Sequence, residues 1–410
     1  METRELYGEK GKKSVWDMNP AEFVNELDES FSTENKFIAN NRAKYINNPR
    51  VTEAIDVFTG LTIPLAEVAK AQALTAPAKS WKKLSPEAIE ALNRHIDSVI
   101  INLGKTNPFM AQVLELAQQE LFGLSGSDPQ RMHEVALKLE NLSWESYKSG
   151  LPTLYFPLDN AWGKLLHPGD AHGADVWDAR VILLIPPSDE DQKQLRDWTD
   201  KVANFYQSSF PNLDLESLNE IRLLIGENVA FAGTEIVSHT AGEALENVIM
   251  IDTESYYFEP SEKITEQEFK NLYLRLMIGH ELAHKVQGLA VGTQHAELHE
   301  WMCDVLAWRM AANYIGQFDL EKQTELFKAL DFQATKELEK HGIKRRDDPF
   351  VKSYRASDLW YFETRKDNPS LESWINRLDK AITTLWDSES EEAKLALELE
   401  EQDAKNKSVI

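Results

Sequence analysis

The chain has 410 residues and a formal charge of −24, from 44 basic and 68 acidic side chains. This length exceeds what one ordinary domain needs and predicts two or three domains. The negative charge disfavours nucleic acid and anionic membrane surfaces as partners, because their phosphate groups would be repelled. A single cysteine, Cys303, excludes an intramolecular disulfide framework and a cysteine-rich zinc finger.

Neither a targeting segment nor a membrane span is visible in the sequence. Residues 1–15 are polar and lack an apolar core of signal-peptide length. No run approaches the roughly 18 apolar residues that would cross a bilayer. We therefore expect a cytoplasmic protein, with export by a route that lacks a cleaved signal as the alternative. The sequence makes no prediction about oligomeric state.

Residues 1–150 show a mostly helical pattern and are expected to form a helical domain with its own core. Ser85 is a good N-cap and Pro86 suits the first position of a helix. Apolar residues then recur at three- and four-residue steps, as in an amphipathic helix. Two further helices are expected at about 108–122 and 129–147.

Residues 151–175 hold several prolines and glycines, a composition typical of a connector between domains. His167 and His172 lie in this stretch. Two histidines in a polar loop could bind a metal, but we expect solvated loop residues.

The pattern changes in residues 176–386, which we expect to form a second domain. A short apolar run at 180–185, ended by two prolines, predicts a buried strand. A helix follows, and further strands are expected at 221–225, ending at Gly226, and at 247–258. The order is therefore strand, helix, strand, strand and then helices.

One stretch carries residues suited to metal chemistry. His280, Glu281 and His284 match the pattern H-E-x-x-H. Thr265 and Glu268 form a capping box ahead of it, so the motif is expected on a helix. The two imidazoles are four residues apart, so they lie on one helix face and can share a metal ion. Glu281 points about 100° away from them, yet it can reach a water molecule on that ion.

A second helix, expected at about 294–315, carries Glu300 and Asp304 one turn apart. A catalytic zinc site needs a third protein ligand and leaves one position for water. Glu300 can be that ligand, and Asp304 can accept the other ring N–H of a ligating histidine, His280 being the expected one. The rival third ligands are His295, Glu297 and His299.

These two helices together resemble the gluzincin-type zinc metallopeptidases, in which an H-E-x-x-H helix precedes a helix bearing E-x-x-x-D. The resemblance covers about residues 176–320. It implies an α+β fold: an N-terminal helical domain and then a compact zincin-like metallopeptidase domain, with a small sheet beside the two helices. The strand at 247–258 occupies the place of the substrate-binding edge. The matching residues are His280, Glu281, His284, Glu300 and Asp304.

The resemblance also implies roles for these residues. His280, His284 and Glu300 would bind one zinc ion per chain. Glu281 would act as general base on the zinc-bound water. Asp304 would accept a hydrogen bond from the ring of a histidine ligand.

The chain departs from the family pattern in several places. The linker between the two helices is short, and Cys303 stands where the family often has a small residue. We expect Cys303 to be buried and structural. A three-histidine ligand set is disfavoured, because the sixth residue after His284 is Ala290 rather than histidine.

Related enzymes supply a further donor to the oxyanion from a residue beyond the second helix. The candidates here are His341, Tyr354 and Arg355. For each of them taken singly, an ordinary surface or core position is the favoured interpretation over the role of donor.

The sequence thus predicts a zinc-dependent metallopeptidase, a hydrolase that acts on peptides or proteins. The main alternative is a non-catalytic peptide-binding or regulatory protein on the same fold, in which zinc is absent or structural. A zinc hydrolase of non-peptide amides is a third hypothesis. The presence of Glu281 favours an enzyme, because a decayed enzyme would often have lost this residue.

Residues 387–410 are expected to be an exposed acidic helix or tail.

Overall fold

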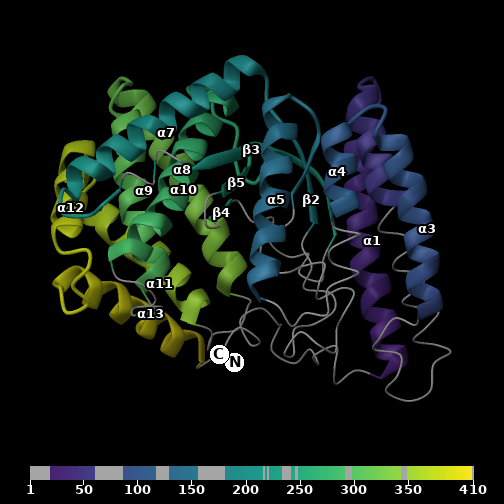
Figure 1. Ribbon diagram of the computed structural model, residues 1–410. Coiled ribbons are helices and arrows are strands. Elements are labelled where there is room, and N and C mark those ends of the chain that lie inside the picture. Colours follow the sequence, from purple (N-terminus) through teal and green to yellow (C-terminus); the bar gives the residue numbers. More distant parts are fainter. Residues whose placement is uncertain are drawn as a thin grey trace. The chain divides into compact units, whose positions relative to one another are not determined.

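The computed structural model describes a mixed α+β protein (Figure 1). The residues in it divide into two compact units, one within 11–192 and 224–239 and the other within 193–223 and 240–410. The expected division into 1–150, 151–175, 176–386 and 387–410 stays a prediction. The residues that the structure describes are 19–60, 86–116, 129–155, 181–215, 218, 221–232, 242–244, 248–290, 298–342 and 349–408.

The helices of the first unit confirm the helical pattern of the N-terminal region. Asn19 caps the first of them, since its side chain accepts hydrogen bonds from two backbone N–H groups of the first turn. The later helices begin at proline, as predicted for Pro86. The helix expected at about 108–122 is described as far as Leu116, and its residues 117–122 lie outside the described residues. These elements are α1 (Pro20–Lys44), helical residues 49–60, α3 (Pro86–Leu103), α4 (Pro108–Leu116) and α5 (Pro129–Lys148).

Three antiparallel strands complete the first unit: β1 (Thr153–Tyr155), β2 (Val181–Ile185) and β3 (Arg222–Ala232). The second of them confirms the predicted buried strand. The first lies in the stretch that we expected to be a connector, where we had predicted no strand. It pairs with β2 from Thr153 to Tyr155. His167 and His172 lie outside the described residues.

Strand β3 runs through Gly226, where we had expected the strand to end. A Cβ atom at this position would lie 2.3 Å from the carbonyl oxygen of Ile185 on β2. The glycine therefore allows close approach of the two strands and does not mark a turn. The register shifts nearby, between Leu183 and Leu184, as in a β-bulge.

The second unit contains a short antiparallel pair, β4 (Gly242–Ala244) and β5 (Val248–Asp252). All five residues of β5 are buried. The strand ends at Asp252, whose carboxylate accepts a hydrogen bond from the backbone N–H of Glu254 at 3.0 Å. This turn stops the strand, so our extension of it to residue 258 was wrong.

Helices make up the rest of the second unit. The most enclosed of them is α9 (His299–Ile315), most of whose side chains are buried. It packs against α8 (Glu266–Ala290), α11 (Pro349–Asp367) and α12 (Leu371–Thr383). The capping box of Thr265 and Glu268 is confirmed, with backbone-to-side-chain distances of 2.8 and 3.1 Å. No helix in the described ranges is both long and apolar enough to cross a membrane. The helices are α7 (Asp189–Ser209), α8 (Glu266–Ala290), α9 (His299–Ile315), α10 (Leu320–Gly342), α11 (Pro349–Asp367), α12 (Leu371–Thr383) and α13 (Glu391–Ser408).

The acidic C-terminal segment is helical as expected, but one face of α13 is buried. Glu392, Ala396 and Glu400 recur every fourth residue on this face, and all three are buried. Arg355 of α11, which is fully buried, places Nη1 3.2 Å from Oε1 of Glu400 and also pairs with Asp403. The ion pairs explain how so acidic a helix can pack against the unit.

Candidate metal centre

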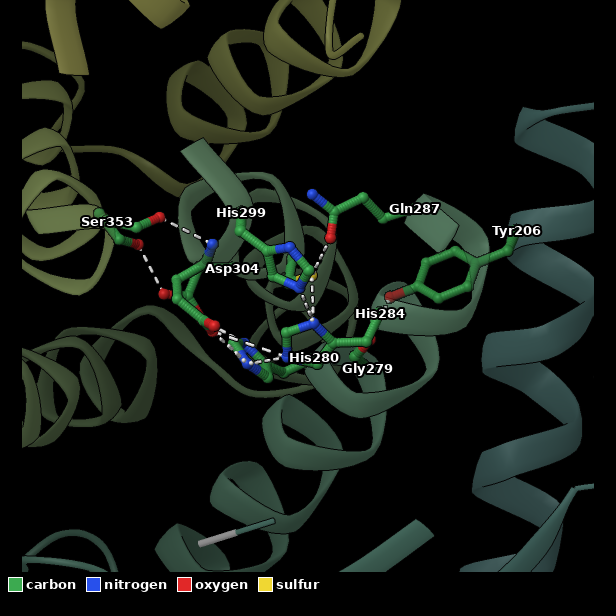
Figure 2. A network of polar contacts seen from close by, with 11 residues as sticks. Tyr206, Gly279, His280, His284, Gln287, His299, Asp304 and Ser353 are labelled. Atoms are coloured by element: carbon green, nitrogen blue, oxygen red, sulfur yellow. Dashed lines mark hydrogen bonds and ion pairs between the residues drawn. The ribbon is translucent and has the colours of Figure 1, made fainter. Parts of the chain in front are cut away.

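The histidines of the H-E-x-x-H motif lie on the part of α8 that packs against α9. Apolar neighbours such as Ile278 and Leu282 are fully buried, and only 6% of His280 is exposed. Gly279 allows the two helices to approach, since a Cβ there would lie 3.1 Å from the Cα of Ala307 on α9. Its carbonyl oxygen accepts a hydrogen bond of 2.6 Å from the hydroxyl of Tyr206 (Figure 2).

Three possible ligand atoms converge between α8 and α9. Nε2 of His280 lies 3.1 Å from Oε2 of Glu300, and Nε2 of His284 lies 3.6 Å from the same oxygen. The two imidazole nitrogens are 3.0 Å apart. Atoms bound to one tetrahedral zinc ion at its usual bond lengths are separated by about 3.3 Å. The three atoms are thus within a few tenths of an ångström of the spacing that zinc requires.

The protonation of this cluster also fits a cation. Nδ1 of His280 lies 2.7 Å from Oδ1 of Asp304, so the ring donates its Nδ1–H and turns the lone pair of Nε2 toward the cluster. Oε2 of Glu300 is buried, and no hydrogen-bond donor from the described residues satisfies it. Lone pairs this close repel one another unless a positive charge lies between them. The donor set of two imidazoles and one carboxylate is one that zinc prefers.

The pKa values of His280, His284 and Glu300 are shifted by their burial and by their charges acting on one another. Burial alone would lower the pKa of His280, but the negative charges of Asp304 and Glu300 raise it well above its ordinary value. Burial and the neighbouring imidazoles lower the pKa of His284 to about 3. The histidines hold the pKa of Glu300 at about 2, against the opposing effect of burial. Without a metal, the cluster attracts one extra proton to His280, in the place where a cation would bind.

Glu281 lies beside this cluster. It is buried, with 4% of its surface exposed. One of its carboxylate oxygens lies within 4.8 Å of a ring nitrogen of both His280 and His284. The glutamate is therefore near enough to contact a water molecule held at the cluster.

The far side of the His284 ring has different neighbours. Its Nδ1 lies 2.7 Å from Nε2 of His299 and 3.3 Å from Sγ of Cys303. These three residues also form a group that could hold a metal. The distance of 2.7 Å is typical of a hydrogen bond and too short for two ligands on one zinc ion. His299 therefore lies behind His284, away from the convergence of the three ligand atoms.

The other rival ligands and the oxyanion candidates are less well placed or not described. His295 and Glu297 lie outside the described residues, as does the side chain of His341 on α10. Tyr354 is half-buried on α11, and its role stays a prediction. Arg355 pairs with two acids of α13, so its charge is engaged away from the cluster.

Sequence reasoning missed two serines that support the cluster from α11. Oγ of Ser353 accepts a hydrogen bond of 2.8 Å from the backbone N–H of Glu300. Oγ of Ser357 donates to Oδ2 of Asp304 at 2.5 Å. The two serines are four residues apart on α11, and each contacts one of the two acids that are four residues apart on α9. The sequence contains both spacings, but nothing in it indicates that these helix faces meet.

Comparisons of the chain with protein-family models, with curated proteins and with solved structures find no match. The assignment of a function therefore rests on the residues of the cluster and their geometry.

Proposed function

We propose that the chain is a zinc-dependent metallopeptidase that hydrolyses peptides or proteins. One observation carries the proposal: Nε2 of His280, Nε2 of His284 and Oε2 of Glu300 lie 3.0 to 3.6 Å apart. Oε2 of Glu300 is buried and has no hydrogen-bond donor among the described residues. Glu281 lies next to them. The zincin-like fold is part of the same proposal, as is the binding of one zinc ion per chain.

Each residue has a distinct task in this proposal. His280, His284 and Glu300 would hold the ion, which supplies Lewis acidity that polarises a carbonyl group and makes water more acidic. Glu281 accepts the proton of the attacking water and returns it to the leaving amine. Asp304 holds the Nδ1 proton of His280, so that Nε2 stays free to coordinate. Tyr354 and His341 remain candidates for the donor to the oxyanion.

The test combines metal analysis with the substitution Glu281→Gln. We expect about one zinc ion per chain in both proteins, since Glu281 is not a ligand. Hydrolysis of a diverse peptide library should fall by at least about a hundredfold in the variant, because proton transfer is lost. Glu401→Gln, which changes an exposed glutamate on α13, is the matched control and should leave activity unchanged.

Two results would contradict the proposal in different ways. A wild-type chain without zinc, after purification in zinc-containing buffer, would exclude the metal centre. Stoichiometric zinc without hydrolysis of any peptide would exclude the peptidase. It would favour the non-catalytic alternative or a hydrolase of non-peptide amides.

A further inference from the structure

The Nδ1 atoms of His280 and His284 face different kinds of hydrogen-bond partner. His280 donates its Nδ1–H to the carboxylate of Asp304. Within the described part of the chain no carboxylate bonds to Nδ1 of His284, which faces Nε2 of His299 at 2.7 Å and Sγ of Cys303 at 3.3 Å. Figure 2 shows the ring of His284 between His299 and His280.

A histidine that coordinates through Nε2 must carry its proton on Nδ1, and that proton needs an acceptor when the ring is largely buried. The thiol is a poor acceptor, because sulfur accepts hydrogen bonds weakly. It also donates its own hydrogen to Oε1 of Gln287, with 3.8 Å between the two atoms. Nε2 of His299 is closer to His284 than the sulfur is and is the stronger base.

We propose that His299 is a positioning residue of the metal centre: its Nε2 accepts the Nδ1–H of His284 and keeps Nε2 of His284 directed at the ion. His299 then carries its own proton on Nδ1. This inference rests on the proposed metal centre and extends it. The residue next to the third ligand in the sequence orients the second ligand, so α9 supports both histidines of α8, through Asp304 and through His299.

The experiment compares substitutions that keep or remove the acceptor. Glutamine places its carbonyl oxygen near the position of Nε2, whereas asparagine is too short to reach His284. His299→Asn should weaken zinc binding by about 10- to 100-fold, and His299→Gln should bind within about threefold of the wild type. The measurements are competition with a chromophoric chelator and the visible absorption spectrum of cobalt-loaded protein. This spectrum should change in His299→Asn and be restored in His299→Gln.

Further variants distinguish a failure of the role proposed for His299 from a failure of the proposed metal centre. Cys303→Ala should keep zinc affinity close to that of the wild type. Equal zinc affinity and equal cobalt spectra in His299→Asn and the wild type would overturn the role of His299 and leave the metal centre intact. Complete loss of zinc in His299→Gln, as in Glu300→Gln, would overturn it too, because His299 would then be a ligand. A wild-type chain that binds neither zinc nor cobalt would overturn both claims.

Discussion

Ser357 on α11 donates a hydrogen bond to Asp304 on α9, with 2.5 Å between Oγ and Oδ2. The other oxygen of Asp304 accepts the Nδ1–H of His280 on α8, at 2.7 Å. Ser357 therefore fixes the position of the Asp304 carboxylate, and that carboxylate fixes the orientation of the His280 ring. Through this chain of contacts, a helix that follows the motif by more than sixty residues influences the geometry of the candidate metal centre.

We expect Ser357→Ala to weaken zinc binding by about tenfold, because Asp304 loses a hydrogen bond to a charged group. Without it the carboxylate holds the ring of His280 less firmly. Competition with a chelator measures the change. Thr364→Val is the matched control, since Thr364 is also buried on α11 but its hydroxyl donates to carbonyl groups of its own helix. Equal losses in both variants would mean that the effect comes from α11 as a whole.

Zinc should stabilise the folded chain, because the ligand atoms converge only when α8 and α9 pack together. At free zinc about 100 times the dissociation constant, the free energy of unfolding should rise by about 2.7 kcal/mol. Urea unfolding with zinc and with a chelator measures this difference. Glu300→Gln should abolish it, and the exposed substitution Glu401→Gln should retain it. Stabilisation that survives in Glu300→Gln would place the ion elsewhere.

The buried ion pairs of Arg355 should hold α13 in place. Arg355→Met leaves the carboxylate of Glu400 buried without its partner, so we expect a loss of about 3–5 kcal/mol in the free energy of unfolding. Lys405→Met removes an exposed pair with Glu401 on the same helix and should cost less than about 1 kcal/mol. Urea unfolding of both variants tests the difference. Similar small losses would indicate that apolar contacts alone secure the helix.

The close approach of α8 and α9 depends on Gly279. A valine there would meet the Cα of Ala307, a backbone atom that cannot turn aside. We expect Gly279→Val to lower the free energy of unfolding by about 1–3 kcal/mol and to weaken zinc binding, because both histidines move away from Glu300. At Gly104 a Cβ would have only ordinary contacts, the nearest at 3.5 Å, so Gly104→Val is the control for zinc affinity. Unchanged zinc binding in Gly279→Val would disprove the link between helix spacing and the site.

Much of the local structure followed from the sequence. The capping box at Thr265 and Glu268, the apolar steps after it and the prolines at helix starts are signals that act within one or two turns, and the structure confirms the helices they predicted. The strand boundaries were mispredicted for the same reason, because they were also inferred from local signals. Gly226 is a turn residue in isolation, and only the backbone of β2 beside it explains why a strand continues through it.

The sequence by itself determined that two imidazoles share one face of α8 and that Glu300 and Asp304 share one face of α9, because four-residue spacing sets direction on a helix. Only the tertiary structure decided that these faces meet, that His299 lies behind His284, and that Ser353 and Ser357 reach the acids from α11. Such contacts depend on how closely helices far apart in the sequence pack. That distance is set by small residues such as Gly279 and by the shape of the whole core, which no local pattern encodes.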